Sequence, residues 1–113
     1  MEYSLSGEKN TDTILFVHGL AANLSQFKLQ HEHFGKDFKV LSVNLRGHGN
    51  SKLSNDFTSS DFQLSLMGND IIELLDLLHI ENVHYVGNSM GGNVGYEILK
   101  SKPQILKSFT TFG

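Results

Sequence analysis

The chain has 113 residues, of which 39% are apolar and 19% charged, a composition typical of one globular domain and not of a disordered segment. Its formal net charge is -3 and its basic residues are scattered singly, which argues against nucleic acid as a partner. It has no cysteine, which excludes disulfides and thiolate metal sites.

The N-terminal segment "MEYSLSGEKN" has neither the basic region nor the apolar region of a signal peptide. No apolar run approaches the length of a membrane span. We therefore expect a cytoplasmic protein that does not contact a membrane.

The first half of the chain predicts three strands and a helix. Residues 2–7 alternate weakly and indicate an edge strand, whereas 13–19 form a continuous apolar run that indicates a strand buried on both faces. Residues 23–34 predict a helix with a weak pattern. A second buried strand is expected at 38–47.

Residues 61–80 predict the clearest helix of the chain. A threonine or serine among residues 58–60 is available as its N-terminal cap. Asp70 and Glu73 are expected on its solvated face. The opposite face carries an apolar stripe at helical spacing, which consists of Leu64, Met67, Ile71, Leu74, Leu75 and Leu78.

The last part of the chain predicts a strand at 82–88, a helix at 90–102 that stops before Pro103, and a strand at 106–113. Strands that alternate with helices indicate an α/β fold, with a mostly parallel sheet and helices on both faces. In such sheets function gathers at the carboxyl ends of the strands, where the glycine-containing loops of this chain fall.

The segment Gly87-Asn88-Ser89-Met90-Gly91 fits the pattern G-x-S-x-G between a predicted strand and a predicted helix. A sharp turn there holds the serine in a strained conformation, and large side chains two positions to either side would collide. The helix N-terminus beneath the serine favours negative charge nearby. The N–H of Met90 can then point at a developing oxyanion.

Two alternatives exist for this segment. A tight strand-to-helix turn without any chemistry would have the same glycines, because the motif alone is only a hypothesis. A phosphate-binding loop fits less well. Gly92 is followed by Asn93, where such a loop requires lysine, and the segment lacks G-x-G-x-x-G.

Two further loops are expected at the same edge. "HGLAAN" at 18–23 follows the first buried strand, and an N–H of this loop, that of Leu20, can supply a second oxyanion donor. "NLRGHGNS" at 44–51 follows the next strand. In this order, the two loops and the G-x-S-x-G segment resemble the α/β-hydrolase fold family over nearly the whole chain.

The resemblance implies that Ser89 is the nucleophile and that Leu20 and Met90 donate the oxyanion-hole hydrogen bonds. It implies a domain of which 1–113 are the N-terminal part, with the sheet incomplete at its C-terminal edge. The strand order would be 2–7, 38–47, 13–19, 82–88 and 106–113. Supporting residues of the site would be His18, Gly19, Arg46, His48, Gly87, Asn88 and Gly91.

The chain departs from the family pattern at two positions. Asn44 stands where relatives often have aspartate, and Asn88 stands where many have histidine before the serine. The sequence "GNSMGG" also occurs in family members that cleave carbon–carbon bonds and in esterases. It therefore does not choose between these two reactions.

The sequence offers no clear catalytic partner for Ser89. In this family the order is serine, then aspartate or glutamate, then histidine, and the last two come from strands beyond the one that ends at Gly113. Downstream of Ser89 the chain has Glu97 as its only carboxylate side chain and no histidine. The acid and the base are therefore absent from the expected part of the sequence.

The upstream histidines are weak substitutes. His18 and His48 lie in loops at the right edge, but each is better suited to anchoring its loop. His31 begins an H-x-H pair that diverges on a helix, which predicts a solvated face and no metal site. His79 suits a helix C-terminus, and His84 lies within a strand as a structural residue.

The sequence thus predicts a serine hydrolase that acts on a carbonyl substrate such as a carboxylic ester, with no cofactor. The 113-residue chain alone is expected to be inactive or weakly active. The alternative is a non-catalytic fragment that binds a small molecule or complements a second chain. Expected partners are a small-molecule substrate and, through the edge strand at 108–112, a second copy or a C-terminal half.

Overall fold

The computed structural model describes residues 1–20, 22–46 and 63–113, which fold around one five-stranded sheet with the order β1-β3-β2-β4-β5. β1 pairs antiparallel with β3, and the other neighbours are parallel. This is the strand order that the family resemblance implies. The strands are Tyr3–Ser6 (β1), Thr13–Val17 (β2), Lys39–Val43 (β3), Val83–Asn88 (β4) and Leu106–Phe112 (β5).

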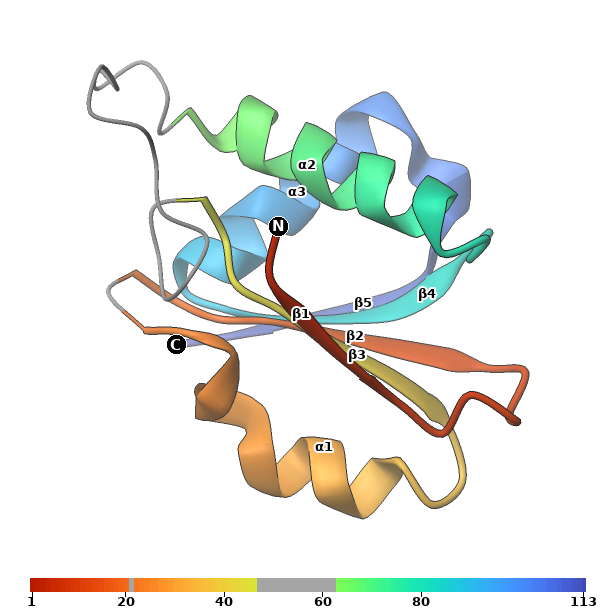
Figure 1. Ribbon diagram of the computed structural model, residues 1–113. Helices are drawn as coiled ribbons and strands as arrows, with labels where there is room; N and C mark the ends of the chain where they lie inside the picture. The colour runs from red at the N-terminus through yellow and green to blue at the C-terminus, as the bar shows by residue number, and fades with distance from the viewer. Residues whose placement is uncertain (21, 47–62) are drawn as a thin grey trace.

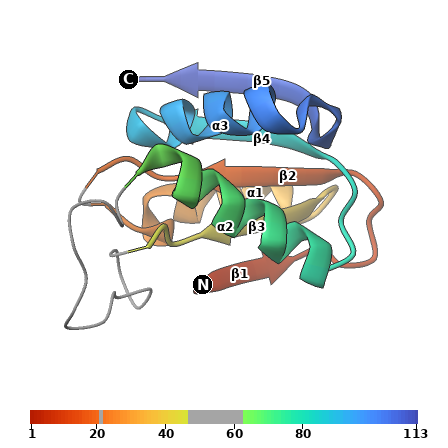
Figure 2. The ribbon, with the colours of Figure 1, turned by 90° about the horizontal axis from the view of Figure 1, so that it is seen from above.

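Helices cover both faces of the sheet, as predicted. α2 and α3 lie side by side on one face, and α1 lies on the other (Figure 1, and from above in Figure 2). The helices are α1 (Lys28–Phe34), α2 (Leu64–Leu77) and α3 (Met90–Ser101), with 3-10 turns η1 (Leu24–Phe27) and η3 (Pro103–Ile105).

The main core lies between the sheet and the pair α2 and α3. Every residue of β2 is buried, as expected for a strand covered on both faces. Four members of the predicted apolar stripe are buried in this core, and two pack against it partly buried: Met67, Ile71, Leu74 and Leu75, and Leu64 and Leu78. The helical spacing of the stripe is therefore confirmed.

The predicted ends of α2 differ from the observed ones. The described helix begins at Leu64 with Gln63 as its N-cap, whose side chain makes no capping hydrogen bond, so the cap expected at 58–60 is wrong. Residues 58–60 themselves lie outside the described ranges. The helix ends at Leu77 and not at residue 80. His79 adopts φ 58°, and this left-handed turn stops the helix.

Two residues predicted to be solvated are held by distant partners. Asp70 accepts two hydrogen bonds from Arg46, Nε to Oδ2 and Nη2 to Oδ1, each 2.7 Å, and both side chains are about three-quarters buried. This bidentate ion pair holds the segment after β3 against α2. His31 lies between two strands, with Nε2 2.7 Å from Ser6 Oγ and Nδ1 2.8 Å from Ser42 Oγ.

Gly95 lies where α3 crosses two aromatic rings. An added Cβ would stand 2.5 Å from Phe109 Cε1 and 2.7 Å from Tyr85 Cε1, and Tyr85 is fully buried. Gly68 on α2 is less confined, since its added Cβ would find its nearest neighbours at 3.5 Å. The two helical glycines therefore differ in how well they tolerate a methyl group.

We expect Gly95→Ala to destabilise the fold by about 1–3 kcal/mol through overpacking. The matched change Gly68→Ala should stabilise it by up to about 1 kcal/mol, because alanine favours the helix. Urea unfolding followed by circular dichroism measures both. Equal or higher stability of Gly95→Ala would mean that the Phe109 ring moves aside at no cost.

Candidate active site

Ser89 occupies a tight turn between β4 and α3 and has an exposed side chain. Its backbone has φ 52° and ψ -111°, a left-handed conformation that costs about 1–3 kcal/mol unless its surroundings hold it. Hydrogen bonds hold the turn on both sides. Ser89 N donates to Phe112 O at 2.8 Å, and Ser89 O accepts from Gly92 N at 2.9 Å.

The glycines around Ser89 allow the backbones of β4, α3 and β2 to touch. A Cβ on Gly87 would lie 2.6 Å from the carbonyl carbon of Gly91. A Cβ on Gly91 would lie 2.2 Å from Val17 O and 2.7 Å from His18 O. Neither position has room for a side chain, because the atoms in the way are backbone atoms.

Tyr85 supports the turn from the core side, a role that the sequence did not indicate. Its ring is fully buried, and its hydroxyl donates to Gly91 O at 2.6 Å. Burial raises the pKa of Tyr85 well above its ordinary value, so the hydroxyl keeps its proton and remains a donor. The only sequence signal was the position of Tyr85 on the inward-facing side of a predicted strand.

His18 joins the loops that follow β2 and β3. It is fully buried, its Nε2 accepts from Leu45 N at 3.0 Å, and its Nδ1 lies 2.7 Å from Gly19 O. Since Nε2 accepts, Nδ1 must carry the proton and donate to Gly19 O. The ring is therefore neutral and uses both nitrogens as anchors, which leaves neither for Ser89.

Gln26 on η1 joins the β2 loop to the end of β4, and sequence reasoning missed it. Gly19 N donates to Gln26 Oε1 at 3.1 Å, and Gln26 Nε2 donates to Asn88 Oδ1 at 2.7 Å. Asn88 Nδ2 in turn donates to Phe112 O at 3.3 Å. This chain of bonds fixes three loops of the strand-end edge relative to one another.

Asn44 uses both atoms of its side-chain amide. Its Oδ1 accepts from Leu24 N at 2.6 Å, as a carboxylate would. Its Nδ2 donates to the carboxylate of Glu2, which an aspartate could not do. The amide therefore ties the start of the loop after β3 to the N-terminal segment.

The two predicted oxyanion donors belong to segments next to Ser89. Met90 is the first residue of α3, where an N–H has no acceptor within the helix. Leu20 belongs to the loop after β2 and is 72% exposed. That loop passes next to the serine, since a Cβ on Gly19 would stand 3.5 Å from Ser89 Cβ.

Of the remaining candidate residues, Arg46 and His84 have polar partners of their own, and His48 lies outside the described ranges. Arg46 is bound by Asp70 on α2. His84 Nδ1 lies 2.8 Å from Ser108 Oγ on β5. His48 belongs to residues 47–62, outside the described ranges. Within those ranges no group of three histidine or carboxylate side chains could hold a metal ion.

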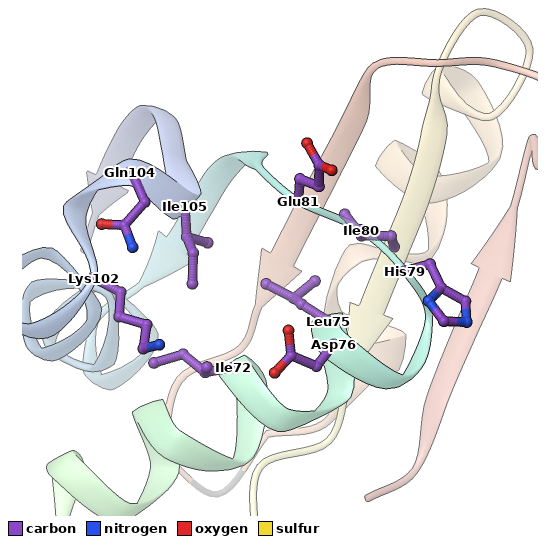
Figure 3. Close-up of a pocket in the computed structure, with 9 residues that line it drawn as sticks. All are labelled: Ile72, Leu75, Asp76, His79, Ile80, Glu81, Lys102, Gln104 and Ile105. Carbon is purple, nitrogen blue, oxygen red and sulfur yellow. The ribbon is translucent and has the colours of Figure 1, made fainter.

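A separate cavity of about 390 Å³ opens at the opposite end of the sheet (Figure 3). It lies between the C-terminal end of α2 and η3, and its lining includes Asp76, Ile80 and Ile105. These residues precede β4 and β5, whereas Ser89 follows β4. The cavity is therefore not part of the serine site.

A family model described as the alpha/beta hydrolase fold matches residues 12–113. The chain belongs to this family. A 3-oxoadipate enol-lactonase of Acinetobacter baylyi is 29% identical over 81% of the chain and 33% of its own length. A protein of Haemophilus influenzae named "Putative esterase/lipase" is 29% identical over 87% of the chain and 32% of its own length.

The α/β-hydrolase fold of the chain also matches solved structures. The enol-lactonase from Burkholderia xenovorans LB400 superposes with a TM-score of 0.82 and 27% identity, over 93% of this chain and 40% of that one. The chain thus spans about a third of the length of the curated relatives named above. In its described part, no helix is long and apolar enough to cross a membrane.

We expect Gly91→Val to unfold the chain or to displace Ser89, because the carbonyls of Val17 and His18 fill the space of any side chain. Comparison with Gly68→Ala separates this effect from the general effect of replacing a helical glycine. Thermal melts followed by circular dichroism measure the stability. A Gly91→Val melt that matches the parent would show that the turn is not confined as described.

Proposed function

We propose that the chain supplies the nucleophile and oxyanion hole of a serine hydrolase that acts on carboxylic esters. The backbone of Ser89 carries the proposal. Ser89 is a non-glycine residue with φ 52°, is exposed at the carboxyl end of β4, and is held by hydrogen bonds on both sides. Strained residues of this kind cluster at active sites. Family membership supports hydrolysis as the reaction class.

In the proposed reaction Ser89 Oγ attacks the substrate carbonyl carbon. The N–H groups of Leu20 and Met90 donate to the oxygen on which negative charge develops, and the N-terminus of α3 favours that charge. The alcohol group of the ester leaves, and water then releases the acyl group from Ser89. Each step needs a base to take a proton and an acid to return it.

The base and acid would come from outside this sequence, since Glu97 is the only carboxylate side chain after Ser89 and no histidine follows. The relatives are about three times as long as the matched region, which leaves room for both groups. Names that contain "esterase" and "enol-lactonase" favour open and cyclic esters over carbon–carbon bonds as substrates.

We expect the 113-residue chain to hydrolyse p-nitrophenyl acetate only weakly and to accumulate an acetyl group on Ser89, because no base drives its removal. A protease without its triad partners retains about 10³–10⁴-fold catalysis over water, which sets the upper limit. Tandem mass spectrometry locates the acetyl group. Added imidazole should accelerate turnover by acting as an external base.

The controls are Ser89→Ala and Ser101→Ala. Ser101 is another exposed serine of α3, so its loss should change nothing. Ser89→Ala should abolish the acetyl group at position 89 and the excess acceleration by imidazole. Equal imidazole-dependent rates in the parent and Ser89→Ala would refute the nucleophile assignment and favour the alternative of a non-catalytic binding module.

We further propose that β5 pairs with another polypeptide, either a second copy or a C-terminal half. In the described part of the chain, β5 has β4 as its only neighbour, so its outer backbone groups face outward. The face of the sheet that α1 covers is also apolar. A cavity of about 390 Å³ there includes Phe16, Phe34 and Val86, and nearby Phe112 is 48% exposed.

Self-association should therefore increase with concentration and decrease in Thr110→Lys, since a charge on an edge strand opposes pairing. Thr11→Lys, at an exposed threonine outside the strands, is the matched control and should associate like the parent. Size-exclusion chromatography with light scattering measures the mass. A monomer at all concentrations, with slow amide exchange at 108–112, would contradict the proposal.

A further inference from the structure

His31 lies between two serine hydroxyls on the α1 side of the sheet. Its Nε2 is 2.7 Å from Ser6 Oγ at the end of β1, and its Nδ1 is 2.8 Å from Ser42 Oγ on β3. The arrangement joins α1 to two strands that are neighbours in the sheet. It involves none of the residues assigned to the Ser89 site.

The protonation state of His31 requires one of these two serines to donate a hydrogen bond to the imidazole. Burial lowers the pKa of His31, and the nearby Glu32 carboxylate opposes this shift, so the neutral ring is favoured at neutral pH. A neutral ring donates from one nitrogen and accepts at the other. Therefore either Ser6 or Ser42 directs its O–H at a basic nitrogen.

The surroundings distinguish the two serines. Both serines line a cavity of about 330 Å³, but Ser42 is only 1% exposed, whereas Ser6 is half-buried. Of the two, Ser6 is therefore the more accessible to a small molecule. If Nδ1 carries the ring proton, Ser42 Oγ accepts a hydrogen bond from Nδ1 and holds the ring, while the Ser6 hydroxyl donates to Nε2. This is the arrangement of a nucleophile, a base and an orienting group.

We propose that Ser6 is a second nucleophilic hydroxyl of the chain, activated by His31 and open to acylation by small activated esters. Ser6 Oγ forms a bond to the acyl carbon while its proton moves to His31 Nε2. The bond from the acyl carbon to the leaving phenolate breaks, and the phenolate takes up the proton. The products are an acylated Ser6 and a free phenol.

The charges that line the cavity suit this step. The carboxylate of Glu32 favours the transient imidazolium of His31. The ammonium of Lys28 lines the same cavity and favours the negative charge that develops on the carbonyl oxygen. The cavity volume suits a short acyl group, so p-nitrophenyl acetate is an appropriate probe.

The test uses the Ser89→Ala chain, so its outcome is independent of the function proposed for Ser89. After incubation with p-nitrophenyl acetate, tandem mass spectrometry measures the acetyl group on each serine. Ser4 and Ser25 line the same cavity and are internal controls, since neither bonds to a histidine in the described contacts. A general base contributes at least about 100-fold, so Ser6 should exceed both by that factor.

The matched variant His31→Gln keeps a polar side chain at this position and should reduce acetylation of Ser6 to the level of Ser4, with unchanged circular dichroism. The comparison of Ser6 with Ser4 in the unmodified His31 background does not depend on how that variant folds. Equal acetylation of the two serines there would overturn the proposal. So would full acetylation of Ser6 in a folded His31→Gln chain.

Discussion

The approach of α3 to the backbone of β2 is the constraint on which the rest of the serine site depends. At Gly91 the helix passes so close to the carbonyls of Val17 and His18 that no side chain fits between them. β4 must therefore pass into α3 within one residue, and Ser89 takes a left-handed conformation to do so. The exposure of the serine follows from this packing.

The polar contacts around the turn hold its neighbours in place. His18 binds the loop after β2 to the loop after β3, and Gln26 binds the β2 loop to Asn88 at the end of β4. Tyr85 fixes the first turn of α3 from the core. In the proposed reaction, such a frame would let the N–H groups stabilise a developing charge with little rearrangement.

Local patterns in the sequence predicted most of the fold, whereas long-range partners were not predictable. Buried strands and the apolar stripe of α2 are encoded by neighbouring residues, so their existence was recovered. The order of the strands in the sheet came from the family resemblance. Asp70 meets a partner 24 residues away, the more distant partner of His31 is 25 residues away, and that of Gln26 is 62 away. The sequence shows that such residues are polar but not which group they meet. The end of α2 depends on the backbone of His79, which composition does not encode.

The carboxyl end of β5 is the part of the described chain from which a base for Ser89 could be supplied. Two hydrogen bonds join Phe112 O to the turn, one from Ser89 N and one from Asn88 Nδ2. The carboxyl end of β5 therefore lies against Ser89, and a Cβ on Gly113 would stand 3.6 Å from Ser89 N. A polypeptide that continued from β5 would therefore begin next to Ser89. His18, His31 and His84 each have a polar partner of their own. If one of these histidines acted as the base for Ser89, its present hydrogen bonds would have to break. A base on such a polypeptide would not have this cost.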